Sequence, residues 1–558
     1  MTCFKLLDVF DVVFLTMSGF FTADIVDYPF LFSRLFITTA KFSSVISPTV
    51  IQHYIHAATT VISIDMPPPV MVGACRAIID LLPKINNVIL FDSGSLLTSL
   101  TDLLHRVFDE TLHLVLETLE VSISKGANVE SSVESVISPA LLNLWAMNVS
   151  DPFLCISIIE VLEAIKNVPG AIHPLVSRVL PQIGSILQEQ HQHVEGLVAA
   201  SLDLVTMMLK NAPMDVVKAI YDVCFDAIVQ ILITSDDHSE LQNATQSLAM
   251  LVAEGNQQIF AWTNDPSTIM TRLLNVASRL LDSSMDSSGS LYVGSYVLQL
   301  LLYLPNQMAQ HLQDLVSALV RRLQSAQIIA LRTALLLILA RLVHLSHPNV
   351  ANFIEILMKV PAEIHDNALV YVMFEWTRHQ ADVLGAYQIK VMTSALALLL
   401  SSKHPALENI VVHGNIIKSS GIVTRSKSKL CPDQWTLVPL QHKIMAILAD
   451  AVIEIQEQGS EDGDNDRNES AEVNCSDSDS LLLVSALIHA AGHTDKLEDK
   501  DDVDDELLCS ADPLNKLELA SFLANFFKNF SLSDRQFFDH LCQGLNPAQV
   551  QAVHSVIC

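Results

Sequence analysis

The chain has 558 residues, of which 50% are apolar and 17% are charged, and its 61 acidic side chains outnumber 32 lysines and arginines to give a formal net charge of −29. This apolar fraction excludes an intrinsically disordered chain, which combines low hydrophobicity with high charge. The 17 glycines and 21 prolines are too few for a collagen-like, low-complexity or turn-rich all-β protein, so a largely helical protein is expected. The acidic balance argues against direct nucleic-acid binding, which needs clustered lysines and arginines, and favours basic partners.

Residues 1–29 form an atypical N-terminal segment. The stretch from Phe4 to Phe21 is strongly apolar, but Asp8 and Asp11 lie inside it. A signal peptide needs a basic region before its apolar stretch and a small-residue cleavage site after it, and this segment offers only Lys5. The sequence therefore disfavours a signal peptide.

Residues 30–402 repeat one pattern. Apolar helical stretches begin after a polar or proline break at intervals of 39, 43, 43, 45, 49 and 38 residues. They begin at Val70, Asp109, Pro152, Glu195, Glu240, Gly289 and Gln327. Two helices in roughly 40 to 47 residues are typical of HEAT or armadillo repeats, each of which must stack on the next to bury its apolar stripes. We therefore expect an all-α solenoid, a superhelix of antiparallel helix pairs; a large all-α domain with coincidental spacing is the alternative.

A second set of helices is expected between these stretches, for example at 140–147 and 175–188. Proline is tolerated in a first helical turn and disfavoured in a helix interior, so several prolines predict helix starts or the turns before them. These are Pro139, Pro174, Pro213, Pro266, Pro305 and Pro348.

The stretch from Ile328 to Leu345 is nearly long and apolar enough to span a membrane. Arg332 and Arg341 interrupt it, and two arginines at mid-membrane depth cost about 5 to 7 kcal/mol on the insertion scale. We therefore expect a buried helix and no membrane insertion. In the following repeat, Glu375 and Trp376 form a polar and aromatic pair. This pair indicates either a packed Trp whose indole N–H has a partner or a contact with a binding partner or a neighbouring repeat.

Residues 403–453 are expected to form an irregular basic loop followed by the last repeat helices. Arg425, Lys427 and Lys429 make the loop basic. Three charges in a loop are commonly just solvated, and the alternatives are a nuclear-localisation or phosphate patch or pairing in cis with an acidic segment. We treat these residues as a possible interaction loop.

Residues 454–512 form an acidic insertion. This segment holds 19 acidic residues against one arginine and two lysines, which is −16 of the total −29 in 59 residues. Such a composition cannot bury enough apolar area to offset the entropy of ordering, so a disordered insertion is expected, interrupted by the apolar stretch Leu481–His489. Residues 513–558 regain a helical pattern and are expected to form C-terminal capping helices.

Two acidic lobes are the candidate residues for binding basic partners. The first contains Glu461, Asp462, Asp464, Asp466, Glu469 and Glu472, and the second contains Glu498, Asp499, Asp501, Asp502, Asp504, Asp505 and Glu506. These lobes are expected to speed encounters with cationic partners and to hold them loosely. A purely solubilising segment is the alternative.

Metal-binding and catalytic motifs are absent from the sequence. The nine cysteines are scattered, with no C-x2-C pair, as is typical of buried thiols in a reducing compartment. His191 with His193, and His344 with His347, lack cysteine or carboxylate companions at set spacing, so no metal site is expected. Nucleophile-elbow, P-loop and H-E-x-x-H motifs are also missing, and we expect neither an enzyme nor a cofactor.

Four ordered blocks resemble the C-terminal half of importin-β (karyopherin) family receptors. Three of them are ALVYVMFEWTRHQADVLGAYQIKV from Ala368, GIVTRSKSKLCPDQWTLVPLQHKI from Gly421, and DPLNKLELASFLANFF from Asp512; the fourth is the acidic run around LLLVSALIHAAG. FLFSRLFITTAKFSSVISPTVIQ from Phe30 is also similar, so the resemblance covers nearly everything after residue 29.

The resemblance implies a nuclear import receptor that shuttles between cytoplasm and nucleus. It implies basic protein cargo such as core histones and ribosomal proteins, contacts with Phe-Gly nucleoporins, and regulation by Ran-GTP. The similarity starts part way through the family's superhelix, so Ran binding, which the family's N-terminal repeats mostly supply, is expected to be weakened or lost. A HEAT-repeat scaffold or an acidic histone-chaperone-like protein without Ran-regulated transport is the alternative.

Overall fold

The computed structural model describes residues 28–43, 46–64, 66–84, 93–107, 110–126, 129–189, 194–263, 265–416, 435–461 and 512–557. The chain divides into two compact units between Ile231 and Leu232. Each unit is a stack of α-helix pairs, so the predicted α-solenoid fold class is confirmed.

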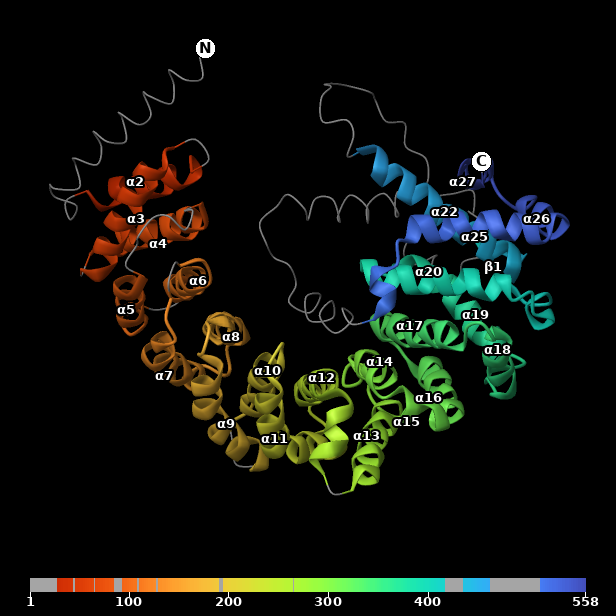
Figure 1. Cartoon of the computed structure of the whole chain (residues 1–558), viewed down its shortest axis with the longest axis horizontal. Helices are drawn as coiled ribbons and strands as arrows, with labels where there is room; N and C mark the ends of the chain where they lie inside the picture. The colour runs from red at the N-terminus through yellow and green to blue at the C-terminus, as the bar shows by residue number, and fades with distance from the viewer. Residues whose placement is uncertain are drawn as a thin grey trace, which may run out of the picture. The chain divides into compact units, whose positions relative to one another are not determined.

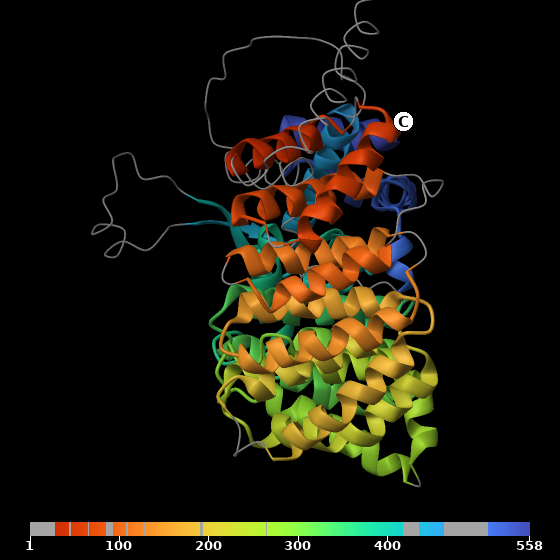
Figure 2. The same cartoon turned by 90° about the vertical axis from the view of Figure 1, so that its left-hand side faces the viewer.

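The first unit consists of two layers of helices (Figures 1 and 2). In the first layer α2, α4, α6, α8 and α10 pack in succession, and in the second α3, α5, α7 and α9 do the same. The bounds are α2 Pro29–Lys41, α3 Pro48–Ser63, α4 Pro68–Leu81, η2 Leu82–Lys84, α5 Ser93–Leu104, α6 Glu110–Lys125, α7 Ser132–Met147, α8 Pro152–Asn167, α9 Ile172–Gln188, α10 Leu197–Leu209 and α11 Met214–Thr234, whose last residues cross into the second unit.

The second unit also consists of two layers of helices. Helices α12, α14, α17, α20 and α22 pack in succession as one layer, which we call the inner layer, and α13, α16, α18 and α19 lie beside it. Their bounds are α12 His238–Gly255, η4 Asn256–Trp262, α13 Pro266–Leu280, α14 Val293–Tyr303, α15 Pro305–Met308, η5 Ala309–His311, α16 Leu312–Ser325, α17 Ile329–Ser346, α18 Val350–Lys359, α19 Ala368–His379, η6 Gln380–Asp382, α20 Ala386–Ser401, η7 Pro405–Leu407 and α22 Leu440–Glu461. The C-terminal elements η8 Pro513–Lys516, α25 Leu519–Ser533, α26 Arg535–Cys542 and α27 Pro547–Ile557 pack on α20 and α22.

Burial follows the layers. Helix α13 buries one stripe, with Ile269, Leu273, Val276 and Leu280 at helical spacing. Inner-layer helix α14 buries eight consecutive or near-consecutive residues from Val293 to Leu301, because it is enclosed by α12, α13 and α17. A helix that is apolar on all sides is stable only in such a place.

Polar contacts between successive repeats reproduce the predicted period. Side chains bond to groups 41 to 50 residues away throughout both units. Lys166, for example, donates from Nζ to the carbonyl oxygens of Met207 (2.8 Å) and Lys210 (3.0 Å), two acceptors one repeat further along. This spacing fits HEAT or armadillo repeats and is too long for a TPR repeat of about 34 residues.

The proline predictions were correct at some helix starts and wrong at Pro139. Pro266 and Pro305 are the first residues of their helices, as expected. Pro139 instead lies inside α7, which begins at Ser132, because the buried residues Val133 and Ile137 before it and Leu141 after it share one packed face. Tertiary packing thus outweighs the cost of one missing backbone hydrogen bond.

Helix α17 is a core helix of the second unit, as predicted. Among the described residues it alone is long and apolar enough to cross a membrane by length and composition, and half of that window is buried in the fold. Both of its interrupting arginines find carboxylate partners, Arg332 with Glu375 (Nη1–Oε2 2.6 Å) and Arg341 with Asp512. Trp376 is fully buried, and its indole N–H donates to Oε1 of Gln380 (3.0 Å), which is the packed arrangement weighed above.

A two-stranded sheet departs from the all-helical expectation. Strands β1 (Val411–Ile416) and β2 (Trp435–Pro439) are antiparallel and pair Val412 with Val438, with a bulge between His413 and Ile416. The first part of the region expected to be an irregular loop is therefore a hairpin base. Its β-branched residues at 411, 412, 436 and 438 favour strands.

Candidate interaction site at the base of the acidic insertion

Most of the predicted site residues lie outside the described residues. These are Asp462, Asp464, Asp466, Glu469, Glu472, Glu498, Asp499, Asp501, Asp502, Asp504, Asp505 and Glu506 of the two lobes, and Arg425, Lys427 and Lys429 of the possible interaction loop. Only the backbone of Glu461 is described, as the last residue of α22. What the structure does describe is how both segments are attached to the second unit.

Helix α22 connects the two attachment points. It begins at Leu440, directly after β2, and the 22-residue helix ends at Glu461, the first residue of the first acidic lobe. At 1.5 Å per residue its length is about 33 Å. Residues 454–461, which composition assigned to the insertion, therefore continue a helix.

Aromatic rings hold strands β1 and β2, which flank residues 417–434, against helix α19. The imidazole of His413 on β1 stacks on Trp435 of β2 (centroids 5.4 Å apart, planes 6° apart) and meets the ring of Phe374 on α19 edge-on at 4.6 Å. Phe374 in turn contacts His365 (5.4 Å). These contacts fix the base of the possible interaction loop against α19.

The other end of the acidic insertion is pinned at Asp512. Composition places this residue in a solvated segment, but its side chain is fully buried. The guanidinium of Arg341 donates to both carboxylate oxygens (Nε–Oδ2 2.5 Å, Nη2–Oδ1 3.2 Å), and Tyr387 Oη donates to Oδ2 (2.9 Å). Asp512 also caps η8 by accepting from the backbone N–H of Leu514 (3.0 Å). The carboxylate thus joins α17, α20 and the C-terminal elements.

A second set of contacts supports this anchor. Lys390 of α20 donates from Nζ to the carbonyl oxygen of Asn515 (2.9 Å). His344, one turn beyond Arg341, donates from Nε2 to the carbonyl oxygen of Val391 (3.1 Å). Burial lowers the pKa of His344 to about 4, so its imidazole is neutral at physiological pH.

The C-terminal helices α25, α26 and α27 pack against α22 through polar and apolar contacts. Gln549 donates to Oδ1 of Asp450 (2.7 Å), and burial raises the pKa of that carboxyl group. Phe527 and Phe538 are almost completely buried among these helices. The insertion thus departs from the end of α22 and returns to the fold at the buried Asp512.

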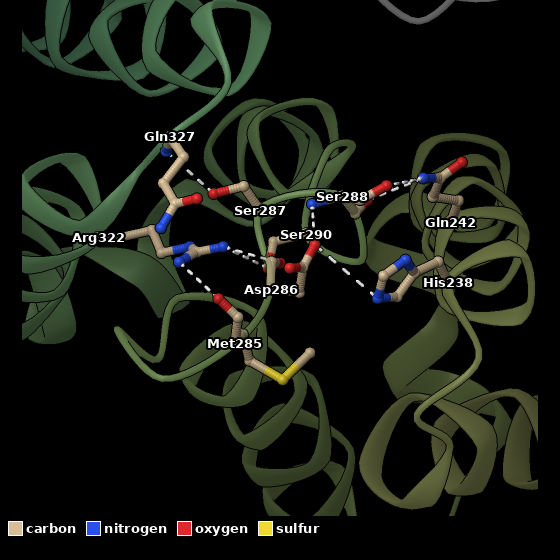
Figure 3. A network of polar contacts seen from close by, with 9 residues as sticks. All are labelled: His238, Gln242, Met285, Asp286, Ser287, Ser288, Ser290, Arg322 and Gln327. Atoms are coloured by element: carbon tan, nitrogen blue, oxygen red, sulfur yellow. Dashed lines mark hydrogen bonds and ion pairs between the residues drawn. The ribbon is translucent and has the colours of Figure 1, made fainter.

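Another polar network holds the loop between α13 and α14 (Figure 3). The fully buried Arg322 of α16 donates to the carbonyl oxygens of Met285 (3.0 Å) and Asp286 (3.0 Å) and to Ser290 Oγ (2.9 Å). On the other side Gln242 of α12 donates to the carbonyl oxygen of Ser288 (2.8 Å). The sequence analysis did not predict the role of Arg322 or the Arg341–Asp512 pair. The sequence signal that could have indicated them is an arginine within a helix whose neighbouring positions are apolar.

Comparison with known proteins decides the family. The family model described as "Importin-11-like, TPR repeats" matches residues 154–556, which is most of the chain. The chain belongs to this importin-β family. The resemblance expected from the four sequence blocks is thereby confirmed.

Individual relatives agree with this importin assignment. The four blocks resemble importin-9 in particular, and importin-9 of Drosophila melanogaster is 22% identical over 78% of this chain and 43% of its own length. Importin subunit beta-5 of Schizosaccharomyces pombe is 23% identical over 71% of this chain and 39% of its own length. This importin-family chain therefore spans about two fifths of the length of these curated relatives.

A solved structure shares the fold of this importin-family chain. The exportin Cse1 in its cargo-free, cytoplasmic state is 12% identical, superposes with a TM-score of 0.56, and is matched over 98% of this chain and 51% of that chain. At this identity the likeness concerns the fold alone.

Cysteine and metal chemistry find little support in the described part of this importin-family chain. Burial raises the pKa of Cys75 and Cys155 to about 11 and that of Cys224 to about 12, which makes these thiols unreactive. Among the residues that the structure describes, no group of three or more His, Cys, Asp and Glu side chains is arranged so that it could hold a metal ion. His191 and His193 lie outside those residues, and His344 is engaged as described above.

Proposed function

We propose that this importin-family chain is the cargo-side part of a nuclear import receptor that binds basic proteins, such as core histones and ribosomal proteins, through its acidic insertion. The observation that carries the proposal is the concentration of charge, −16 of the total −29 in residues 454–512. The family, shown by the match over residues 154–556, supports a role in transport. The relatives' names, importin-9 and importin subunit beta-5, support import.

The mechanism we propose is electrostatic capture followed by fit. Both ends of the polyanion are attached to the packed second unit, at Glu461 of α22 and at Asp512. A basic protein drawn in by the lobes is therefore brought against the helical stack, where shape-complementary contacts hold it. Because the Debye length is about 8 Å at physiological ionic strength, the capture step depends strongly on salt.

The remaining parts of the proposed function follow the family. We propose that this chain shuttles between cytoplasm and nucleus, contacts Phe-Gly nucleoporins, and responds to Ran-GTP more weakly than the family's complete superhelix. No enzymatic step and no cofactor belong to this function.

The test removes the negative charge of the acidic insertion and keeps the contacts of Asp512 that attach its end to the second unit. Residues 460–505 are replaced by a neutral Gly-Ser linker of equal length, which leaves Asp512 and its partners in place, and affinity for a core-histone dimer is measured by calorimetry across salt concentrations. We expect weaker binding and a flatter dependence on salt. Unchanged affinity and unchanged slope would leave the insertion a solubilising segment. Thermal unfolding of both chains controls for folding.

A second experiment with Ran-GTP distinguishes a transport receptor from a histone-chaperone-like protein. An immobilised core-histone dimer loaded with this chain is washed with Ran-GTP or Ran-GDP, and release is compared. Release by Ran-GTP alone supports transport regulation within this chain. Cargo binding with no response to Ran-GTP favours the acidic histone-chaperone-like function.

A further inference from the structure

An apolar groove lies on the inner layer of the second unit. Its volume is about 350 Å³, and it is formed by α14, the first half of α17 and the segment that leads into α20. Its lining includes Ile329 and Leu337 of α17, Leu384 before α20 and Gln388 of α20. Gly294 forms part of its floor, where a Cβ atom would lie 2.8 Å from Cβ of Ala334, so the glycine lets α14 and α17 approach closely.

The walls of the groove expose large apolar side chains. Ile329 is 53% exposed on one wall and Leu384 is 63% exposed on the other. A concave apolar surface with two such side chains at its rim is typical of a binding site for another apolar surface.

The acidic insertion returns to the fold within a helical turn of this groove. Its last residue, Asp512, is held by Arg341 and Tyr387. Arg341 follows the groove residue Leu337 by four positions on α17, about 6 Å along the axis. Tyr387 directly precedes the groove residue Gln388 on α20. The two helices that pin the insertion are therefore two of those that form the groove.

The insertion itself contains a matching occupant. Seven of the nine residues of Leu481–His489 are apolar, between two acidic lobes. His489 is 23 residues from Asp512 and Leu481 is 20 residues from Glu461, and extended chains of those lengths reach about 80 and 70 Å. From Asp512 the groove is about one helical turn away, well within reach. From Glu461 the path is at most the roughly 33 Å length of α22 plus about 20 Å for the two helix-to-helix steps from α22 over α20 to α17, which is shorter than 70 Å, so neither tether prevents the stretch from reaching the groove. Tethering also gives the stretch an effective concentration in the millimolar range.

We propose that the apolar stretch Leu481–His489 docks in cis into the groove formed by α14, α17 and the start of α20. Docking holds one acidic lobe on each side of the groove, next to the stack. The contact is made within the chain and involves no cargo, so it stands or falls independently of the proposed import function.

Hydrogen exchange on the full-length chain tests the groove. We expect amides of residues 481–489 to exchange at least about tenfold more slowly than those of 462–472. Leu384→Asp and Ile329→Asp place a charge on the rim at exposed positions and should abolish that protection. Ile364→Asp, at a side chain that is 90% exposed and outside the groove, is the matched control and should preserve it. Lack of protection in the unsubstituted chain, or equal protection in all four chains, overturns the proposal.

A competition experiment tests the occupant. A fluorescent peptide LLLVSALIH is titrated into a chain whose residues 462–511 are replaced by a Gly-Ser linker. It should bind that chain, bind the full-length chain at least tenfold more weakly, and lose binding with Leu384→Asp. No binding to the linker chain, or equal binding to both chains, contradicts docking in cis. Protection that rises with protein concentration together with a dimer in light scattering would assign the groove to a second copy and also overturn the proposal.

Discussion

Arg341 and Asp512 are 171 residues apart in the sequence, yet their side chains form a buried two-point ion pair with Nε and Oδ2 at 2.5 Å. Arg341 lies in the middle of an apolar helix, and Asp512 is the first described residue after the acidic insertion. The pair therefore fixes where the insertion ends on the second unit.

Removing one partner of this pair should destabilise the second unit strongly. Arg341→Met leaves the Asp512 carboxylate buried without its cation, which typically costs about 3 to 5 kcal/mol. Urea unfolding, monitored by tryptophan fluorescence, should show the lower stability. Limited proteolysis between α22 and α25 should become faster for the same reason. Asp512→Asn, which keeps a hydrogen-bond acceptor but leaves Arg341 unpaired, is expected to be destabilising as well.

The exposed pair Lys218–Asp222 provides the control for this prediction. Its atoms are also 2.5 Å apart, but both side chains are nearly half exposed. Lys218→Met should cost only about 0.3 to 0.5 kcal/mol, the value of exposed i, i+4 pairs. If the two substitutions lower the free energy of unfolding equally, burial does not make the Arg341–Asp512 pair more important for stability than an exposed pair.

Arg322 should hold the loop between α13 and α14. Arg322→Lys loses the fork that reaches Met285, Asp286 and Ser290, and we expect destabilisation of about 2 to 4 kcal/mol because several buried acceptors lose a charged donor. Proteolytic cleavage between residues 282 and 292 should become faster. Arg321→Lys, at the exposed neighbouring position, should leave the cleavage rate unchanged.

His344 should make stability fall in mild acid. Its pKa is lowered from 6.5 to about 4 in the folded chain, chiefly by burial. Between pH 4 and pH 6.5 the unfolded state binds more protons than the folded state. The free energy of unfolding is therefore unaffected by protonation of His344 above pH 6.5 and decreases as the pH falls from 6.5 toward 4. The amount is on the order of 3 kcal/mol.

Urea unfolding at pH 7.5, 6, 5 and 4.5 checks the sign and the residue. His344→Asn should reduce the decline in stability between pH 6.5 and 4.5, because asparagine does not titrate. His53→Asn, at an exposed position of α3, should not change it. An unchanged profile in His344→Asn would place the acid sensitivity elsewhere.

The two acidic lobes should contribute separately to cargo capture. Neutralising the first lobe by Glu→Gln and Asp→Asn substitutions at 462–472, or the second lobe at 498–506, should each flatten the salt dependence of core-histone binding. Neutralising both should flatten it further, because long-range charge effects at separate places add. If one lobe carries the whole effect, capture depends on a local site and not on the polyanion as such.

Sequence periodicity predicted the repeats well but assigned local boundaries less well. The intervals near 43 residues reappear as side-chain contacts between repeats, such as Arg178 with Glu134, 44 residues apart. Composition placed Asp512 in the solvated insertion and missed the hairpin at Val411, because charge density and strand propensity say nothing about which residues a distant helix will cover. Pro139 is inside α7 for a related reason, since packing on both sides outweighs a local preference.

The amino-acid sequence by itself determined the helical repeat class and the position of the negative charge. Both are local, one-dimensional properties: an apolar stripe at helical spacing must be buried by a neighbour, and a run of carboxylates cannot be buried at all. Only the tertiary structure decided that Arg341 meets Asp512, that Arg322 holds a loop of the preceding repeat, and that α14, α17 and α20 leave a groove beside the insertion. These relationships depend on the packing of helices far apart in the chain, where the desolvation of a charge is offset only by the partner that the fold brings to it.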